Sequence, residues 1–161
     1  MQENVDIRFV EYGSREWHEG RALRHKLFYQ ALGHPQSVMD DDQEHHSAHL
    51  VVQENGKVVG YGRLFDHGAG EFQISQMAVD ADRQGRGIGK LILKRLVNQA
   101  FDGGAKRIWL NARTSATRFY EKEGFRPCGK VFPSEKTGLP HIKMQLMLAA
   151  CAPYGQPDKK G

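Results

Sequence analysis

The sequence contains only two cysteines, Cys128 and Cys151, among its 161 residues. So few thiols do not predict a disulfide framework, and a reducing cytoplasm would keep both side chains in the thiol form. No apolar run approaches the roughly 18 residues that a membrane-spanning helix requires, and the first residues lack the pattern of an export signal. These absences predict a cytoplasmic protein that does not cross a membrane.

Internal repeats, low-complexity blocks and tracts of Lys and Arg are also missing. The formal net charge is +4, and the Lys and Arg residues are spread along the chain without the interleaved aromatics of a nucleic-acid surface. A length of 161 residues suits one ordinary domain. We therefore expect a single domain over residues 1–150, a flexible tail over 151–161, and small anionic ligands rather than nucleic acid.

The first half of the chain has the pattern of a strand, a helix and a hairpin. A strand is expected over residues 5–9, and Ser14 is a typical cap for a following helix. The polar residues 39–47 indicate a solvated loop, whose histidines and carboxylates match no closed metal motif. Strands over 48–53 and 58–65 flank an Asn-Gly pair, which is a strong hairpin signal. The inward side chains of the helix are predicted to be Trp17, Leu23, Leu27, Phe28 and Ala31.

Residues 71–79 form the next predicted strand, and the apolar positions change parity along it. They are even-numbered up to Ile74 and odd-numbered from Met77 onward. An extra residue near Ser75-Gln76 would turn the inward face over, which is what a β-bulge does, and bulges are enriched beside active sites. An irregular strand end is the alternative interpretation.

A glycine-rich segment from Gln84 to Lys90 follows this strand and opens a helix. Glycine has no Cβ, so the main chain can approach a ligand, and the N–H groups and dipole of a helix N-terminus attract anions. The segment matches neither the ATP-binding pattern G-x-x-x-x-G-K-[ST] nor the dinucleotide fingerprint G-x-G-x-x-G. A pyrophosphate group is the ligand that suits this turn. The helix is expected to bury Ile88, Leu91, Ile92, Leu96 and Ala100.

The remaining elements are short. A strand is expected over residues 108–112, and the capping candidates Thr114 and Ser115 precede a short helix that ends at Gly124. Two further strands, over 125–131 and 142–148, complete the predicted domain.

Two ordered motifs resemble a known family. Gln84-Gly85-Arg86-Gly87-Ile88-Gly89 fits the pattern Q/R-x-x-G-x-G/A of the acetyl-CoA loop in the GNAT superfamily of N-acetyltransferases. Further along, ATRFYEKEGF at residues 116–125 is similar to the second signature of that superfamily. Leu23-Arg24, LNARTSA at 110–116 and GLPHIKM at 138–144 resemble the ElaA-like branch. The Glu-Gln pair and the Gly-Arg pair that are usual in that branch are absent here.

The resemblance implies an α/β fold with a mixed, mainly antiparallel central sheet that splays between its fourth and fifth strands and is flanked by helices. It also implies an N-acetyltransferase with acetyl-CoA as co-substrate, no metal, and a small-molecule or peptide amine as acceptor; a homodimer is left open. Arg113 stands where many members have a pantetheine-binding asparagine, and Asn111 is the replacement that we consider. The residues implied in cofactor binding are Met77, Ala78, Val79, Gln84, Gly85, Arg86, Gly87, Ile88, Gly89, Lys90, Asn111 and Arg113.

For catalysis we expect direct attack of the amine on the thioester, with both substrates bound together. Tyr120 is expected to stabilise and protonate the departing thiolate. The general base is open among Glu71, Gln73, His49 and His141, and His141 is preferred because histidine titrates near neutrality. The alternative function is a catalytically silent acyl-CoA-binding sensor or interaction module with the same fold.

Overall fold

A computed structural model describes residues 4–146 of the chain. Its mixed α/β class and mainly antiparallel strand pairing confirm the predicted class. No helix in this described range is long and apolar enough to span a membrane. The predicted tail over 151–161 lies outside the described residues, so the division into one domain and a tail stays a prediction, as does the splay of the sheet. The described residues fall into two compact units, the first of residues 4–65 and 74–99 and the second of 66–73 and 100–146.

The first unit is built on strands in the order β1-β2-β3-β4, and β2 pairs antiparallel with both β1 and β3. Asn55 and Gly56 join β2 to β3 with φ angles of 52° and 81°. Positive φ at both positions is what a type I′ turn requires, so the predicted hairpin is confirmed. The strands are β1 (Val5–Val10), β2 (Ala48–Glu54), β3 (Lys57–Gly68) and β4 (Glu71–Val79).

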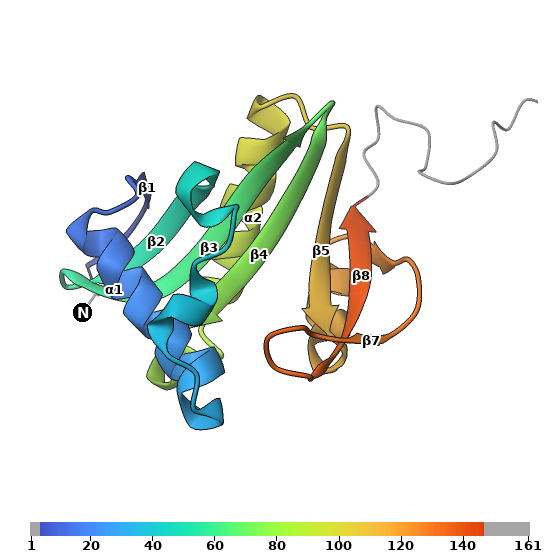
Figure 1. Cartoon of the computed structure of the whole chain (residues 1–161). Coiled ribbons are helices and arrows are strands. Elements are labelled where there is room, and N and C mark those ends of the chain that lie inside the picture. The colour runs from blue at the N-terminus through green and yellow to red at the C-terminus, as the bar shows by residue number, and fades with distance from the viewer. Residues whose placement is uncertain (1–3, 147–161) are drawn as a thin grey trace, which may run out of the picture. The chain divides into compact units, whose positions relative to one another are not determined.

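Helix α2 (Ile88–Asp102) covers one face of these strands, behind the sheet in Figure 1. Gly62 permits the close approach, because a Cβ there would lie 2.7 Å from Cγ2 of Ile92. The buried stripe of α2 passes through Ile92 and Leu93, which are 0% and 1% exposed. The prediction that Leu91 is buried is wrong, since it lies at the border of that stripe and is 39% exposed.

Helix α1 (Arg15–Arg24) covers the opposite face, in front of the sheet in Figure 1. It begins as predicted at Ser14, whose Oγ accepts from the Trp17 N–H at 3.1 Å. A wide π-helical turn then shifts the side-chain register. As a result Tyr29 is buried, whereas Ala31 is exposed and its predicted inward position is wrong. The helical turns that follow are η1 (His25–Tyr29) and η2 (Gln30–Leu32).

The second unit is organised around β8, which pairs antiparallel with β5, β6 and β7. The strand predicted over 125–131 is too long, because β6 ends at Pro127 and the chain leaves the extended conformation at Gly129, whose φ is 108°. Residues 147–148 of the last predicted strand lie outside the described part. The elements are β5 (Arg107–Arg113), η6 (Thr114–Ala116), α3 (Thr117–Lys122), β6 (Phe125–Pro127), β7 (Phe132–Pro133) and β8 (Pro140–Leu146). The core contains Ile108, Leu110, Ala112, Phe125 and Met144.

Candidate functional site

The glycine-rich segment lies in the first unit, between η5 (Ala81–Arg83) and α2. Gly85 and Gly87 have φ angles of 81° and 83°, both are exposed, and no atom lies within 4 Å of where their Cβ atoms would be. The Leu91 N–H donates to the Gly87 carbonyl at 3.1 Å and closes the first turn of α2. The N–H groups before Leu91 therefore lie at the open end of the helix, where an anion can accept from them.

Carboxylates hold some of the basic side chains around this turn. Glu54, at the end of β2 and only 7% exposed, pairs with Arg83 at 3.3 Å and with Arg86 at 3.8 Å. Asp80 also pairs with Arg83, at 3.2 Å. The charge of Arg83 is thus balanced within the protein. The side chains of Arg86 and Lys90 are more exposed and lie at the turn beside its main-chain amides.

The end of β4 is tied directly to the turn. Nε2 of Gln84 donates to the Val79 carbonyl at 3.1 Å. Ala78 is buried in a cluster with Leu23 and Tyr61 beneath α1, so only its main chain is available to a ligand. Met77 and Val79 are half-buried.

β4 carries the predicted bulge. Ser75 and Gln76 are consecutive, yet both side chains point to the α1 face: Oγ of Ser75 accepts from Nε of Arg63 at 3.0 Å, and Nε2 of Gln76 donates to the Tyr29 hydroxyl at 3.3 Å. Gln76 has a φ of 58°, a conformation that costs a residue with a Cβ about 1–2 kcal/mol. Because the strand continues to Val79 beyond this point, the bulge is confirmed and the irregular strand end is not.

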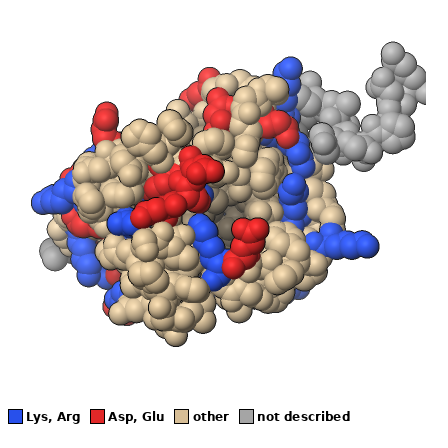
Figure 2. Space-filling view, in the orientation of Figure 1, with Lys and Arg blue, Asp and Glu red and all other residues tan. Residues whose placement is uncertain are grey.

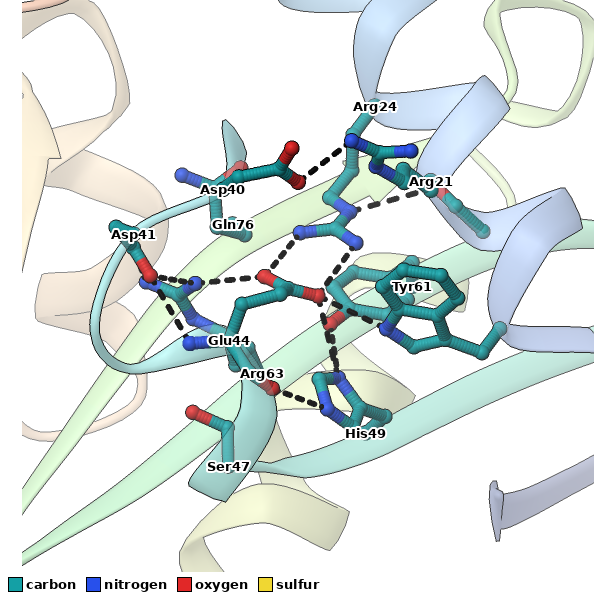
Figure 3. A network of polar contacts seen from close by, with 12 residues as sticks. Arg21, Arg24, Asp40, Asp41, Glu44, Ser47, His49, Tyr61, Arg63 and Gln76 are labelled. Atoms are coloured by element: carbon teal, nitrogen blue, oxygen red, sulfur yellow. Dashed lines mark hydrogen bonds and ion pairs between the residues drawn. The ribbon is translucent and has the colours of Figure 1, made fainter. Parts of the chain in front are cut away.

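A buried network of charges lies on the same face of the sheet (Figure 3). Glu44, in η4 (Glu44–His46), accepts two hydrogen bonds from the guanidinium of Arg24, each at 2.9 Å. It accepts another from Arg63 at 2.8 Å and one from Nε1 of Trp17 at 2.9 Å. Arg24, Glu44 and Arg63 are at most 3% exposed, so the two cations and the carboxylate compensate one another away from water.

This network shifts the protonation of its members. Burial by itself would raise the pKa of the Glu44 carboxyl, but the charges and hydrogen bonds of Arg24 and Arg63 outweigh burial and lower that pKa to about 2. Burial lowers the pKa of His49, whose Nε2 donates to the Glu44 carbonyl at 2.8 Å. His49 Nδ1 then accepts from the Tyr61 hydroxyl at 2.5 Å. Both nitrogens of His49 are engaged inside the protein, so His49 is no longer a candidate for the general base.

The sequence did not reveal this network. The prediction of a solvated loop over residues 39–47 is wrong in part, because Glu44 is turned inward by η4 and is buried. The residue in the sequence that could have indicated the network is Arg63, since a charged residue within an otherwise apolar strand requires a buried partner. Acidic side chains still gather on the surface of this segment (Figure 2), where Asp40 and Asp42 are exposed. Among residues 4–146, no cluster of His, Cys, Asp and Glu has the arrangement of a metal site.

The second unit places the predicted catalytic residues near Arg113. Tyr120, on α3, is half-buried with its ring 6.0 Å from that of Phe125. Burial raises the pKa of its phenol to about 12, although the charge of Arg113 opposes the shift. Arg113 is also the β5 partner of His141 in β8. Nδ1 of His141 donates to the Leu139 carbonyl at 2.8 Å, which leaves Nε2 as the basic nitrogen.

The other candidates for the general base already have partners within this unit. Glu71 pairs with Arg107 at 2.9 Å. Gln73 is hydrogen-bonded to His67 at 2.9 Å. Asn111, implied in cofactor binding, is exposed on β5.

Comparison with known proteins agrees with this geometry. The profile of the acetyltransferase (GNAT) domain family matches residues 18–148. An uncharacterized N-acetyltransferase of Bacillus subtilis, YjcF, is 35% identical over 127 residues, which cover 76% of this chain and 86% of that protein. The chain therefore belongs to the GNAT acetyltransferase domain family.

Solved structures share the fold. Escherichia coli ElaA matches with a TM-score of 0.76 and 19% identity, covering 88% of this chain and 99% of that one. A GNAT family acetyltransferase from Elizabethkingia anophelis, solved with acetyl-CoA bound, matches with a TM-score of 0.65 and 17% identity, covering 91% of this chain and all of that one, 100%.

Proposed function

We propose that this protein is a cytoplasmic N-acetyltransferase that moves the acetyl group of acetyl-CoA to a primary amine of a small molecule or peptide. The observation that carries the proposal is the open turn of Gly85 and Gly87 at the N-terminus of α2, in a chain of the GNAT family. The acetyl-CoA bound to the Elizabethkingia relative supports the same ligand here. The main chain of residues 84–90 would hold the diphosphate, and Met77, Ala78, Val79, Asn111 and Arg113 would contact the remainder of the cofactor.

Acetyl-CoA supplies a thioester that is already activated, so no covalent enzyme intermediate is required. The first contribution of the protein to catalysis comes from the bulge of β4. A main-chain N–H there would donate to the thioester oxygen as negative charge develops on it. In well-studied acyl transfer, removing one such donor raises the barrier by about 3 kcal/mol. We therefore assign the electrostatic part of catalysis to backbone geometry around Ser75 and Gln76.

Tyr120 would act by hydrogen bonding to the departing sulfur. A phenol pKa of about 12 keeps the proton on Tyr120 at neutral pH. Because a thiol has a pKa of about 8.5, complete transfer of that proton to the thiolate is unfavourable. Stabilisation of the thiolate by the phenol O–H is the role that this pKa favours, with full protonation coming later from solvent.

His141 is the residue that we propose as general base. The hydrogen bond from Nδ1 to the Leu139 carbonyl fixes the tautomer in which Nε2 accepts a proton. The exposed carboxylate of Asp42 favours a cationic acceptor, since opposite charge attracts the amine before it is deprotonated.

Calorimetric titration with acetyl-CoA, followed by a thiol-release assay over a panel of amines, tests the proposal. We expect saturable binding and turnover with at least one amine. Tyr120→Phe should lower kcat by about 100-fold and leave the affinity for acetyl-CoA nearly unchanged, because only the departing thiolate meets the phenol O–H. Binding without turnover of any amine would indicate the acyl-CoA sensor instead. No binding of acetyl-CoA would refute both functions.

A further inference from the structure

The side chain of Gln76 gives the bulge of β4 little support. Gln76 has the left-handed φ of 58° without the freedom of a glycine. Its Nε2 makes a hydrogen bond of 3.3 Å to Tyr29, whereas its buried Oε1 has no hydrogen-bond partner. A strained conformation with such weak side-chain support persists only when neighbouring groups enforce it.

Arg63 supplies that support from the adjacent strand. Nε of Arg63 donates to Oγ of Ser75, the residue before Gln76, at 3.0 Å. The rest of the guanidinium is held by two carboxylates: NH1 and NH2 each donate to Asp41 at 3.1 Å, and NH1 donates to Glu44 at 2.8 Å. The carboxylates of Asp41 and Glu44 fix the planar guanidinium of Arg63 (Figure 3), so its Nε is directed at Ser75.

The hydrogen bonds that fix Arg63 continue through Glu44 to α1. Glu44 itself accepts from the two terminal guanidinium nitrogens of Arg24, each at 2.9 Å. Arg24 and Glu44 are 0% and 3% exposed, so water does not compete for these bonds. The contacts therefore form a continuous path from the helix through two buried charges to Ser75.

We propose that Arg63 is a positioning residue, which acts through Ser75 to hold the bulge of β4 in the conformation that stabilises the thioester oxygen. This inference rests on the proposed acetyl transfer. It assigns a function to a buried charge network that would otherwise add only to the stability of the fold.

Ser75→Ala is the direct test. Replacing Arg63 itself would remove a buried cation from which both Asp41 and Glu44 accept hydrogen bonds, and this loss could unfold the protein. Ser75→Ala removes the hydrogen bond between Arg63 and the bulge, and Ser75→Thr restores a hydroxyl on a residue that strands favour. Ser14→Ala is the matched control, because it also deletes one serine hydrogen bond, the 3.1 Å cap of α1, away from the bulge.

Two measurements separate positioning from stability. In the protein without ligand, Ser75→Ala should speed hydrogen exchange at the amides of residues 75–78 by about tenfold. With acetyl-CoA and the amine of highest turnover, it should lower kcat by about tenfold while KM for acetyl-CoA stays within about twofold. Ser75→Thr should restore both values, and Ser14→Ala should lower the melting temperature without changing either.

The proposal is overturned if Ser75→Ala exchanges and turns over like the wild type, if its bulge loosens with no change in kcat, or if Ser14→Ala has the same effects. Absence of turnover in the wild type would refute the proposed function separately. The hydrogen-exchange measurement on the protein without ligand would still show whether Arg63 holds the bulge through Ser75.

Discussion

Replacing Glu44 with glutamine should destabilise the protein by about 3 kcal/mol at neutral pH, because two buried guanidinium groups then lose the carboxylate between them. The magnitude follows from the pKa of Glu44, which falls from the ordinary 4.5 to about 2 in the folded protein. At about 1.4 kcal/mol per pKa unit, this difference corresponds to about 3 kcal/mol of unfolding free energy.

The pH dependence has a definite sign. A carboxyl whose pKa is lowered by folding contributes its full stability above the pKa of the unfolded chain and loses it as the pH falls toward the folded pKa. The wild type should therefore exceed Glu44→Gln in unfolding free energy by the whole of about 3 kcal/mol above about pH 5. This difference should fall to about 1.5 kcal/mol at pH 3 and come close to zero below about pH 2.

Urea unfolding at pH 7, 5 and 3 measures this difference. Tryptophan fluorescence is a suited probe, because Nε1 of Trp17 donates to Glu44, and circular dichroism gives an independent transition. Glu11→Gln is the control: Glu11 is exposed in the same unit, and its replacement should change the stability by less than about 0.5 kcal/mol. Equal stability of Glu44→Gln and wild type at pH 7, or a difference that is the same at pH 3 and pH 7, would refute the reasoning.

Two glycine substitutions test the turn and the packing of α2. Gly87→Ala should raise the Kd for acetyl-CoA by about tenfold in calorimetry, since a Cβ strains the turn and approaches the ligand; Gly138→Ala, with a similar φ of 74° and equally open surroundings, should leave Kd unchanged. Equal affinities of the two variants would remove the turn from the binding site. Gly62→Ala should cost about 1–3 kcal/mol in urea unfolding, because the added methyl overlaps Ile92. An unchanged urea midpoint would contradict the close approach of α2 to the sheet.

Local chemistry explains why several elements could be predicted from sequence. The Asn55-Gly56 hairpin, the Ser14 cap and the glycine turn before α2 depend on a few adjacent residues whose backbone preferences are strong. The bulge at Ser75-Gln76 was visible because it changes the parity of apolar positions. Family motifs added the acetyl-CoA assignment, which no periodicity could have supplied.

The tertiary structure decided where the charges are compensated. Arg24, Glu44 and Arg63 come from three separate elements, and each resembles a surface residue until folding brings its partners within hydrogen-bond distance. The π-helical turn that buries Tyr29 in place of Ala31 likewise depends on contacts distant in the chain. Sequence alone thus determined most of the elements and the glycine-rich turn before α2, because their causes are local. The buried network behind the bulge required the fold, because a charge is stable away from water only when distant residues meet it there.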